Sequence, residues 1–157
     1  MDDLTMHKMT VNYDDLIANE SSAIDYLIKS SDSFSVTVIT KKPYSQQPPM
    51  FDQYELFKNL IIKYYFNYET WPVDFLGRMK HQILIMCNCN KESRKMLSQM
   101  PNLFLPEINM PEDICFYRNG KPWFATVSHE KLAYIFDAKE EDHKFFSRNG
   151  IKTYDAF

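Results

Sequence analysis

Residues 114–127 read ICFYRNGKPWFATV, and this stretch carries the sharpest local signal in the chain. Its centre is Asn119-Gly120, a pair favoured in a two-residue type I′ turn because both turn positions need a positive φ. Aromatic and β-branched residues, which favour strands, lie on both sides of the pair. We therefore predict a tight antiparallel hairpin at this point.

The register of the hairpin follows from its turn. Counting outward pairs Arg118 with Lys121 and Tyr117 with Pro122. The proline has no N–H and so cannot bond a further strand at that position. A third strand is predicted over 132–136, because Ser128 to Lys131 can turn the chain back. A final helix is expected between the cap-like Asp137 and Gly150.

The chain before the hairpin alternates helical and extended patterns. Hydrophobic spacing of three and four residues predicts helices, and strict alternation or a short continuous apolar run predicts strands. The expected elements are a helix after Asn12 through Ile28, a strand over 33–40, a helix from Asp52 to Tyr68, a strand over 81–87 and a helix from Asn90 to Met100.

The helix from Asp52 is the strongest of these predictions. Asp52 and Glu55 resemble a capping box, and apolar or aromatic residues follow at helical spacing until Trp71-Pro72 ends the segment. The run from Ile83 to Cys87 is apolar throughout, which favours a central strand covered on both faces.

These elements predict an α+β fold: a single domain over 1–157 with a mixed sheet, a C-terminal antiparallel hairpin or meander, and about four helices. A length of 157 residues suits one domain, and we expect the first ten or so residues to be flexible. The alternative is a thioredoxin-like arrangement. It would lack the redox motif of that fold, because no Cys-x-x-Cys follows the first strand.

Composition excludes several classes of function. No apolar run approaches the ~18 residues that cross a bilayer, and the N-terminus lacks a secretory signal, so we expect a cytoplasmic protein without membrane contact. The net charge is −3 and no long Lys/Arg block occurs, which argues against nucleic acid as a partner. Three glycines provide no phosphate-binding loop, and we expect no cofactor.

The three cysteines, Cys87, Cys89 and Cys115, are the first candidates for chemistry. An odd number at uneven spacing does not suggest a disulfide framework, so reduced thiols are expected. A metal or thiol site is the functional alternative, although zinc usually draws on four ligands. Buried cysteines that pack as small hydrophobic residues are the simpler interpretation.

Ser128-His129-Glu130 places a hydroxyl, an imidazole and a carboxylate side by side. Neighbours along an extended chain point apart, whereas a catalytic triad brings its members together from separate segments. We therefore interpret these residues as polar turn residues and predict no catalytic residue.

Aromatic residues make up 15% of the chain. Those near the end of the predicted second helix are more numerous than one face of that helix can bury. Tyrosine and tryptophan are enriched at protein interfaces. One hypothesis is therefore a partner-docking patch that combines the Pro-rich loop with the end of the predicted second helix; its residues would be Tyr44, Tyr65, Phe66, Tyr68 and Trp71. A tyrosine-rich core whose hydroxyls reach solvent is the alternative.

The stretch Met110 to Ile135, MPEDICFYRNGKPWFATVSHEKLAYI, resembles small uncharacterised proteins of low-GC Gram-positive bacteria and their phages. The resemblance covers about a sixth of the chain and implies a bacterial or phage origin, with no activity, substrate or catalytic residue.

Together these features favour a non-catalytic intracellular protein-binding module, such as a toxin-immunity, phage anti-defence or regulatory protein. Its acidic charge favours a basic partner, which it would attract at long range. The alternatives are a small thiol- or metal-dependent enzyme that uses Cys87, Cys89 and Cys115, and a structural homo-oligomer.

Overall fold

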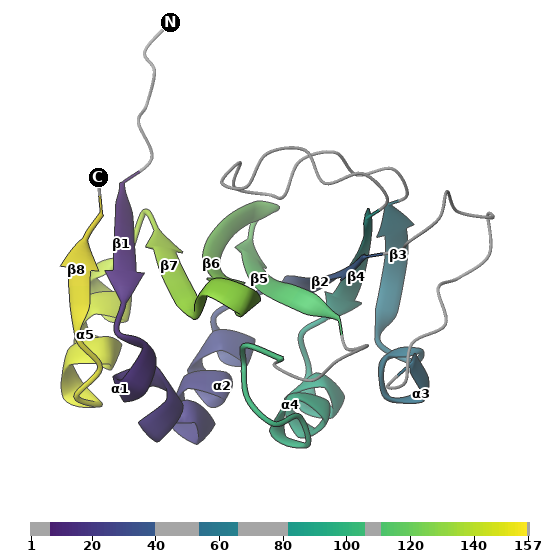
Figure 1. The fold of residues 1–157 in the computed structure, drawn as a ribbon, viewed down its shortest axis with the longest axis horizontal. Coiled ribbons are helices and arrows are strands. Elements are labelled where there is room, and N and C mark those ends of the chain that lie inside the picture. Colours follow the sequence, from purple (N-terminus) through teal and green to yellow (C-terminus); the bar gives the residue numbers. More distant parts are fainter. Residues whose placement is uncertain (1–6, 40–53, 66–81, 106–110, 157) are drawn as a thin grey trace, which may run out of the picture.

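The computed structural model describes residues 7–39, 54–65, 82–105 and 111–156. They form eight strands, five α-helices and one 3₁₀ turn (Figure 1). In chain order these are β1 (Lys8–Val11), α1 (Tyr13–Ala18), α2 (Glu20–Lys29), β2 (Ser33–Ile39), α3 (Tyr54–Phe57), β3 (Ile61–Tyr65), β4 (Gln82–Asn88), α4 (Lys91–Ser98), β5 (Glu112–Arg118), β6 (Lys121–Val127), η1 (Ser128–Glu130), β7 (Leu132–Phe136), α5 (Glu140–Arg148) and β8 (Thr153–Asp155).

All eight strands belong to one sheet, in the order β3-β4-β2-β5-β6-β7-β1-β8. Every pairing in it is antiparallel. The α+β class and the C-terminal meander are confirmed, but the expectation of a mixed sheet is wrong. The thioredoxin-like alternative is also wrong, because β2 and β4 run antiparallel. A continuous apolar run indicates that a strand is buried on both faces. A central antiparallel strand can be buried in the same way, so the run does not show that the sheet has parallel strands.

The predicted helix from Asp52 to Tyr68 is the largest error. Its described part is the short helix α3, a turn, and then the strand β3, which pairs with β4. The strand residues are β-branched or aromatic apart from Lys63, and such residues favour the pleated conformation. Residues 52–53 and 66–68, the rest of the predicted helix, lie outside the described residues.

Helices α1 and α4 follow their capping signals, whereas the predicted cap Asp137 is wrong, because α5 begins after Lys139. Asn12 caps α1 by accepting a hydrogen bond from the Asp15 N–H, and Asn90 forms a capping box with Ser93 at the start of α4. The helix predicted after Asn12 is divided into α1 and α2 at Asn19, where ψ is 26°. Helix α5 ends before Gly150, whose φ is +69°.

The hairpin forms as predicted. Asn119 and Gly120 have φ of 49° and 74°, and Tyr117 pairs with Pro122. Beyond that pair the ladder shifts by one residue, so that Phe116 faces Phe124. Strand β7 then follows at the predicted residues.

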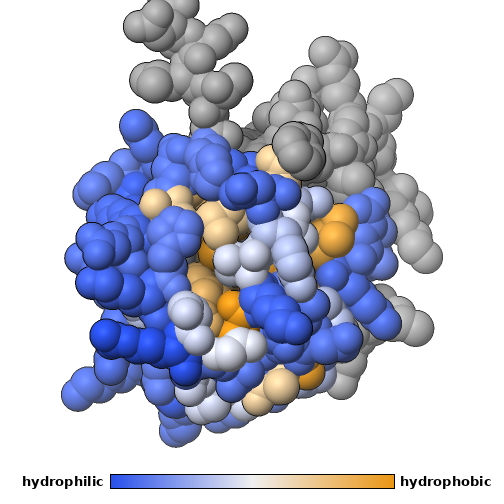
Figure 2. Space-filling model, turned by 90° about the vertical axis from the view of Figure 1, so that its left-hand side faces the viewer, coloured by the Kyte–Doolittle hydropathy of each residue, from blue (hydrophilic) through white to orange (hydrophobic). Residues whose placement is uncertain are grey.

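The two strands at the other end of the sheet, β1 and β8, were not predicted. Lys8–Val11 pairs with both β7 and β8, so part of the stretch expected to be flexible belongs to the sheet. These strands and α5 lie at one side of the molecule, where hydrophilic residues surround a smaller group of hydrophobic ones (Figure 2). None of the described helices is long and apolar enough to span a membrane.

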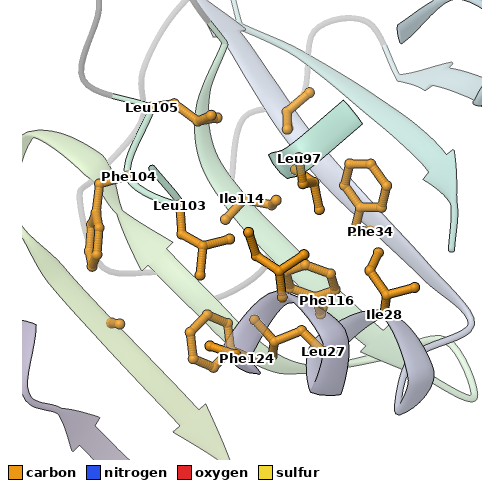
Figure 3. Packing of buried hydrophobic residues seen from close by; sticks show 14 of the residues in the cluster. Leu27, Ile28, Phe34, Leu97, Leu103, Phe104, Leu105, Ile114, Phe116 and Phe124 are labelled. Atoms are coloured by element: carbon orange, nitrogen blue, oxygen red, sulfur yellow. The ribbon is translucent and has the colours of Figure 1, made fainter. Parts of the chain in front are cut away.

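The hydrophobic core lies between the sheet and the helices, which all cover the same face (Figure 1). Figure 3 shows how the core is built. Leu27 of α2 and Leu97 of α4 approach Phe34, Phe116 and other side chains of the sheet. Because neighbouring residues of a strand point to opposite faces, a second set of side chains covers the face without helices. That smaller cluster contains Cys115, Tyr117, Ala125, Val127 and Phe136.

Candidate functional site

Tyr65 is the one member of the predicted docking patch that the structure describes; Tyr44, Phe66, Tyr68 and Trp71 lie outside the described residues. Tyr65 is in β3, where it pairs with Leu84 of β4, and 40% of it is exposed. The Nζ of Lys63 lies 4.8 Å from the centroid of the Tyr65 ring.

Exposed large hydrophobic residues gather around this strand. Leu56 in α3 and Ile62 in β3 are 42% and 56% exposed, and together with Tyr65 they account for three of the four such residues in the described part of the chain. The fourth, Tyr154, lies in β8, at the opposite end of the strand order. The β3 end of the sheet therefore presents most of the exposed large hydrophobic residues that the structure describes.

A cavity of about 400 Å³ opens beside Tyr65 on the face without helices. Its lining comes from five strands and the hairpin turn: Ser33, Tyr65, Leu84, Met86, Tyr117, Gly120 and Pro122. The pairing register explains why they meet. Ser33 pairs with Tyr117, which pairs with Pro122, so these three side chains project from the same face in adjacent strands.

The cavity combines apolar walls with a fixed polar group. Tyr117 is buried, and its hydroxyl lies 2.9 Å from Oγ of the buried Ser35. Met86 offers a flexible thioether, which adapts its shape to different apolar groups. Small-molecule and side-chain pockets commonly have this composition.

The cysteines do not form the predicted cluster. Cys87 and Phe116 both pair with Phe34, on the helix-covered face, whereas Cys115 pairs with Ser35 on the other face. The sheet therefore separates Cys87 from Cys115, and these two thiols cannot share a metal ion. Cys89 packs against the helix-side core with Cys87.

The ionisation of the thiols also argues against a reactive cysteine. Burial raises the pKa of Cys87, Cys89 and Cys115 to about 12. The negative charge of an ionised Cys89 raises the pKa of Cys87 further, and the charge of Asp32 raises that of Cys89. The thiolate is the form that attacks electrophiles and binds metals, and it is scarce at neutral pH when the pKa is so high.

A second group of polar side chains forms where β5 begins and η1 follows β6. Strand β5 has a bulge there, since Ser35 pairs with Cys115 but Thr37 pairs with Glu112. Asp113 lies in the bulge with φ of +51°, a left-handed conformation that aspartate tolerates better than most residues.

Asp113 is held by a reciprocal pair of hydrogen bonds. The Ser128 N–H donates to Asp113 Oδ1 at 2.7 Å, and the Asp113 N–H donates to Ser128 Oγ at 2.9 Å. This link brings His129 of η1 next to Glu112 and Asp113, and the three potential ligand atoms all lie within 4.8 Å of one another. Asp113 is buried, Glu112 half-buried and His129 exposed.

The two carboxyl groups interact with each other and with their surroundings. Burial raises the pKa of Glu112, and the charge of Asp113 raises it further, while His129 opposes both. Burial likewise raises the pKa of Asp113, against the hydrogen bonds of Ser128 and the charge of His129. We refer to Glu112, Asp113 and His129 as the acid–imidazole cluster.

In the sequence, His129 stood out only with its neighbours Ser128 and Glu130, and Glu112 and Asp113 were not predicted as site residues. The structure places Ser128 Oγ as an acceptor from the Asp113 backbone, and it leaves Glu130 exposed. The available signal was Pro111-Glu112-Asp113 at the start of a predicted strand. No comparable feature of the sequence predicts the bulge that directs Asp113 toward Ser128.

Comparison with protein-family models, with curated proteins and with solved structures found no significant match to this chain.

Proposed function

We propose that this chain is a non-catalytic protein-binding module, of the kind that serves as a toxin-immunity, phage anti-defence or regulatory protein. Its docking surface is the β3 end of the sheet, and its partner is another protein that inserts an apolar side chain from an extended segment. The observation that supports this proposal is the cavity of about 400 Å³ beside the exposed Tyr65.

The chemistry of this surface suits a protein segment. Tyrosine and methionine are enriched at protein interfaces, and a partly exposed tyrosine supplies contact area at a low cost in conformational entropy. The cavity has a size appropriate to one or a few side chains. Lys63, stacked over Tyr65, leaves an ammonium group at the rim that a carbonyl or carboxylate of the segment can meet.

Charge supports the choice of partner at longer range. The whole chain has a net charge of −3, which favours faster association with a basic protein and makes the association rate depend on salt. We place the interaction in the cytoplasm, since the three cysteines are free thiols, which persist in a reducing compartment.

The experiment begins with identification of the proteins that co-purify with the chain from its own host. Each candidate is then purified and titrated against the natural chain, Tyr65→Ala and Tyr154→Ala. Tyr154 is the matched control, because it is 52% exposed in the strand at the other end of the sheet. We expect Tyr65→Ala to weaken the affinity at least tenfold, about 1.4 kcal/mol, and Tyr154→Ala to leave it unchanged.

Two outcomes would overturn the proposal. Equal affinity for the natural chain and for Tyr65→Ala combined with Ile62→Lys would exclude the β3 end as the docking surface. Sedimentation of the purified chain as a dimer that Tyr65→Ala dissociates would assign the same surface to a second copy, as the homo-oligomer alternative predicts.

A further inference from the structure

The acid–imidazole cluster offers a chemistry different from that of the proposed docking surface, although Thr37, which pairs with Glu112, also pairs with Leu84 of the cavity wall. Two carboxylates and one imidazole meet from two segments, β5 and η1, which the Asp113–Ser128 hydrogen bonds hold together. In the part of the chain that the structure describes, neither carboxylate forms a salt bridge with a lysine or arginine. Among the described residues, the His129 imidazole is therefore the group that can offset the charge of the two carboxylates.

A second, independent observation points to a ligand at this place. Thr37 is 3% exposed, and its Oγ1 is the one buried side-chain oxygen or nitrogen without a hydrogen-bond partner among the described residues. A buried hydroxyl without a partner costs free energy, so native proteins rarely contain one.

The register connects Thr37 to the cluster. Thr37 pairs directly with Glu112, and paired residues of an antiparallel ladder project to the same face with their Cβ atoms about 4.5–5.5 Å apart. The unsatisfied hydroxyl is thus a neighbour of the Glu112 side chain. A bound ion or its water would give this hydroxyl the partner that it lacks.

We propose that Glu112, Asp113 and His129 bind one divalent first-row transition-metal ion, with the Thr37 hydroxyl next to the ion or to a water on it. Imidazole nitrogen with carboxylate oxygen is a donor set typical of Zn²⁺ and Mn²⁺. Ca²⁺ and Mg²⁺ prefer oxygen ligands alone, so we expect them to bind more weakly.

The geometry of the cluster is compatible with such an ion. Ligand atoms that bind one ion at about 2.0–2.2 Å lie up to about 4 Å apart, and the three potential ligand atoms here lie within 4.8 Å of one another. The His129 side chain is exposed and can turn toward the two carboxylates. The Ser128 N–H holds the Asp113 carboxylate through Oδ1 and so fixes its position beside Glu112 and His129. Three protein ligands leave further coordination positions for water or for a group of a partner.

The test uses the full chain, freed of any affinity tag and treated with a chelator. Isothermal titration with Zn²⁺ and with Mn²⁺ is compared for the natural chain and for Glu112→Gln, Asp113→Asn and His129→Gln. Asn at 113 keeps an acceptor for the Ser128 N–H, which preserves the fold around the site. The control is His143→Gln, an exposed histidine on α5 outside the cluster.

We expect one equivalent of Zn²⁺ or Mn²⁺ to bind to the natural chain and to His143→Gln, and each cluster variant to weaken binding at least tenfold. Bound Mn²⁺ should broaden the NMR signals of residues 37, 112–113 and 128–129 before those of α5. Thr37→Val should weaken the binding several-fold.

The proposal is overturned if the natural chain binds no stoichiometric ion. It is equally overturned if His129→Gln and Glu112→Gln bind the ion as tightly as His143→Gln does, because the ion would then lie elsewhere. Neither result depends on Tyr65, so this inference and the proposed function can fail separately.

Discussion

Arg118 and Asp142 form a bidentate ion pair that joins the hairpin to α5. Arg118 Nη1 donates to Asp142 Oδ2 at 2.8 Å, and Nη2 donates to Oδ1 at 2.6 Å. The Asp142 side chain is fully buried and that of Arg118 is 14% exposed. Asp142 also accepts hydrogen bonds from the Tyr26 hydroxyl and from the Lys139 N–H. One carboxylate therefore connects α2, the hairpin and the first turn of α5.

Replacing this carboxylate should strongly destabilise the protein. Asp142→Asn removes the negative charge and leaves the Arg118 guanidinium, which lies 3.5 Å from the Trp123 ring centroid, without its ionic partner. Breaking a buried pair in this way destabilises proteins by about 3–5 kcal/mol, and we expect about 3 kcal/mol here. Urea unfolding at pH 7 measures the loss.

The control is Glu140→Gln, in the same helix. Glu140 pairs with Lys144 at 3.2 Å, but its side chain is 83% exposed. Exposed pairs contribute little, so the free energy of unfolding should change by less than about 0.5 kcal/mol. Equal effects of the two substitutions would contradict the role assigned to Asp142.

The same ion pair predicts how stability depends on pH. Burial alone would raise the pKa of Asp142, but hydrogen bonds from Arg118 and Tyr26 outweigh it, and the pKa lies below its ordinary value. A carboxyl group with a lowered folded pKa stabilises the protein above its unfolded pKa, and this contribution disappears as the pH falls through the folded pKa. The natural chain should therefore lose stability below about pH 4, and Asp142→Asn should show a shallower loss. Parallel acid titrations of the two unfolding free energies provide the measurement.

Thr37→Val should stabilise the metal-free protein. The substitution replaces the unpartnered buried hydroxyl with a methyl group of similar size, and valine suits a strand as well as threonine does. We expect a gain of about 1 kcal/mol in the free energy of unfolding, measured in the presence of a chelator.

Thr126→Val is the matched control, because Thr126 is also fully buried but its Oγ1 accepts a hydrogen bond from the Ile114 N–H at 3.1 Å. Its loss should leave that N–H without a partner and cost about 1–2 kcal/mol. A loss of stability in both variants would mean that the Thr37 hydroxyl has an unrecognised structural partner.

The parts of the fold that could be predicted from the sequence are those that single residues determine locally. Asn119-Gly120, Asn90 and Gly150 determine backbone conformation locally, so the hairpin, α4 and the end of α5 could be recognised from the residues alone. Strand β3 could not, because Ile61 and Tyr64 are three residues apart, which is a helical spacing. They reach the same face of the strand only through the irregularity between Ile61 and Lys63. The choice of a strand depends on pairing with Ile85 and Cys87 of β4, which are distant in the chain.

The candidate sites depend still more on tertiary structure. Cys87 and Cys115 could be counted in the sequence, but only the register shows that they face opposite sides of the sheet. His129 could be recognised as a candidate only through its neighbours Ser128 and Glu130. Its contacts with Glu112 and Asp113 arise from a bulge, and a one-residue irregularity in a ladder leaves no periodic signal.

For Glu20 we predict a pH dependence of stability opposite in sign to that for Asp142. Burial at the start of α2 raises its pKa to about 7, and a hydrogen bond from the Leu103 backbone opposes the shift only in part. Between the ordinary pKa of glutamate and 7, the folded protein then binds more protons than the unfolded chain, so its stability falls as the pH rises.

Glu20→Gln removes this titration and should make the protein relatively more stable above pH 7, by on the order of 1 kcal/mol for a side chain that keeps some contact with solvent. Unfolding free energies at pH 5 and pH 8 should therefore differ less in Glu20→Gln than in the natural chain. Glu141→Gln, at an exposed position of α5, should leave the difference unchanged.

The buried cysteines give the sharpest test between a binding module and the thiol-dependent alternative. With a pKa of about 12, roughly one thiol in 10⁴ is ionised at pH 8, against about a quarter for an ordinary cysteine. A disulfide reagent at pH 8 should therefore modify Cys87, Cys89 and Cys115 far more slowly in the native protein than in denaturant, where all three should react. Cys89→Ser should remove most of the slow native reaction, because Cys89 is the one cysteine of the three that is not fully buried. Native modification of any one thiol at the rate of free cysteine or faster would instead favour a catalytic thiol and would contradict the assignment of these residues to the packed sheet.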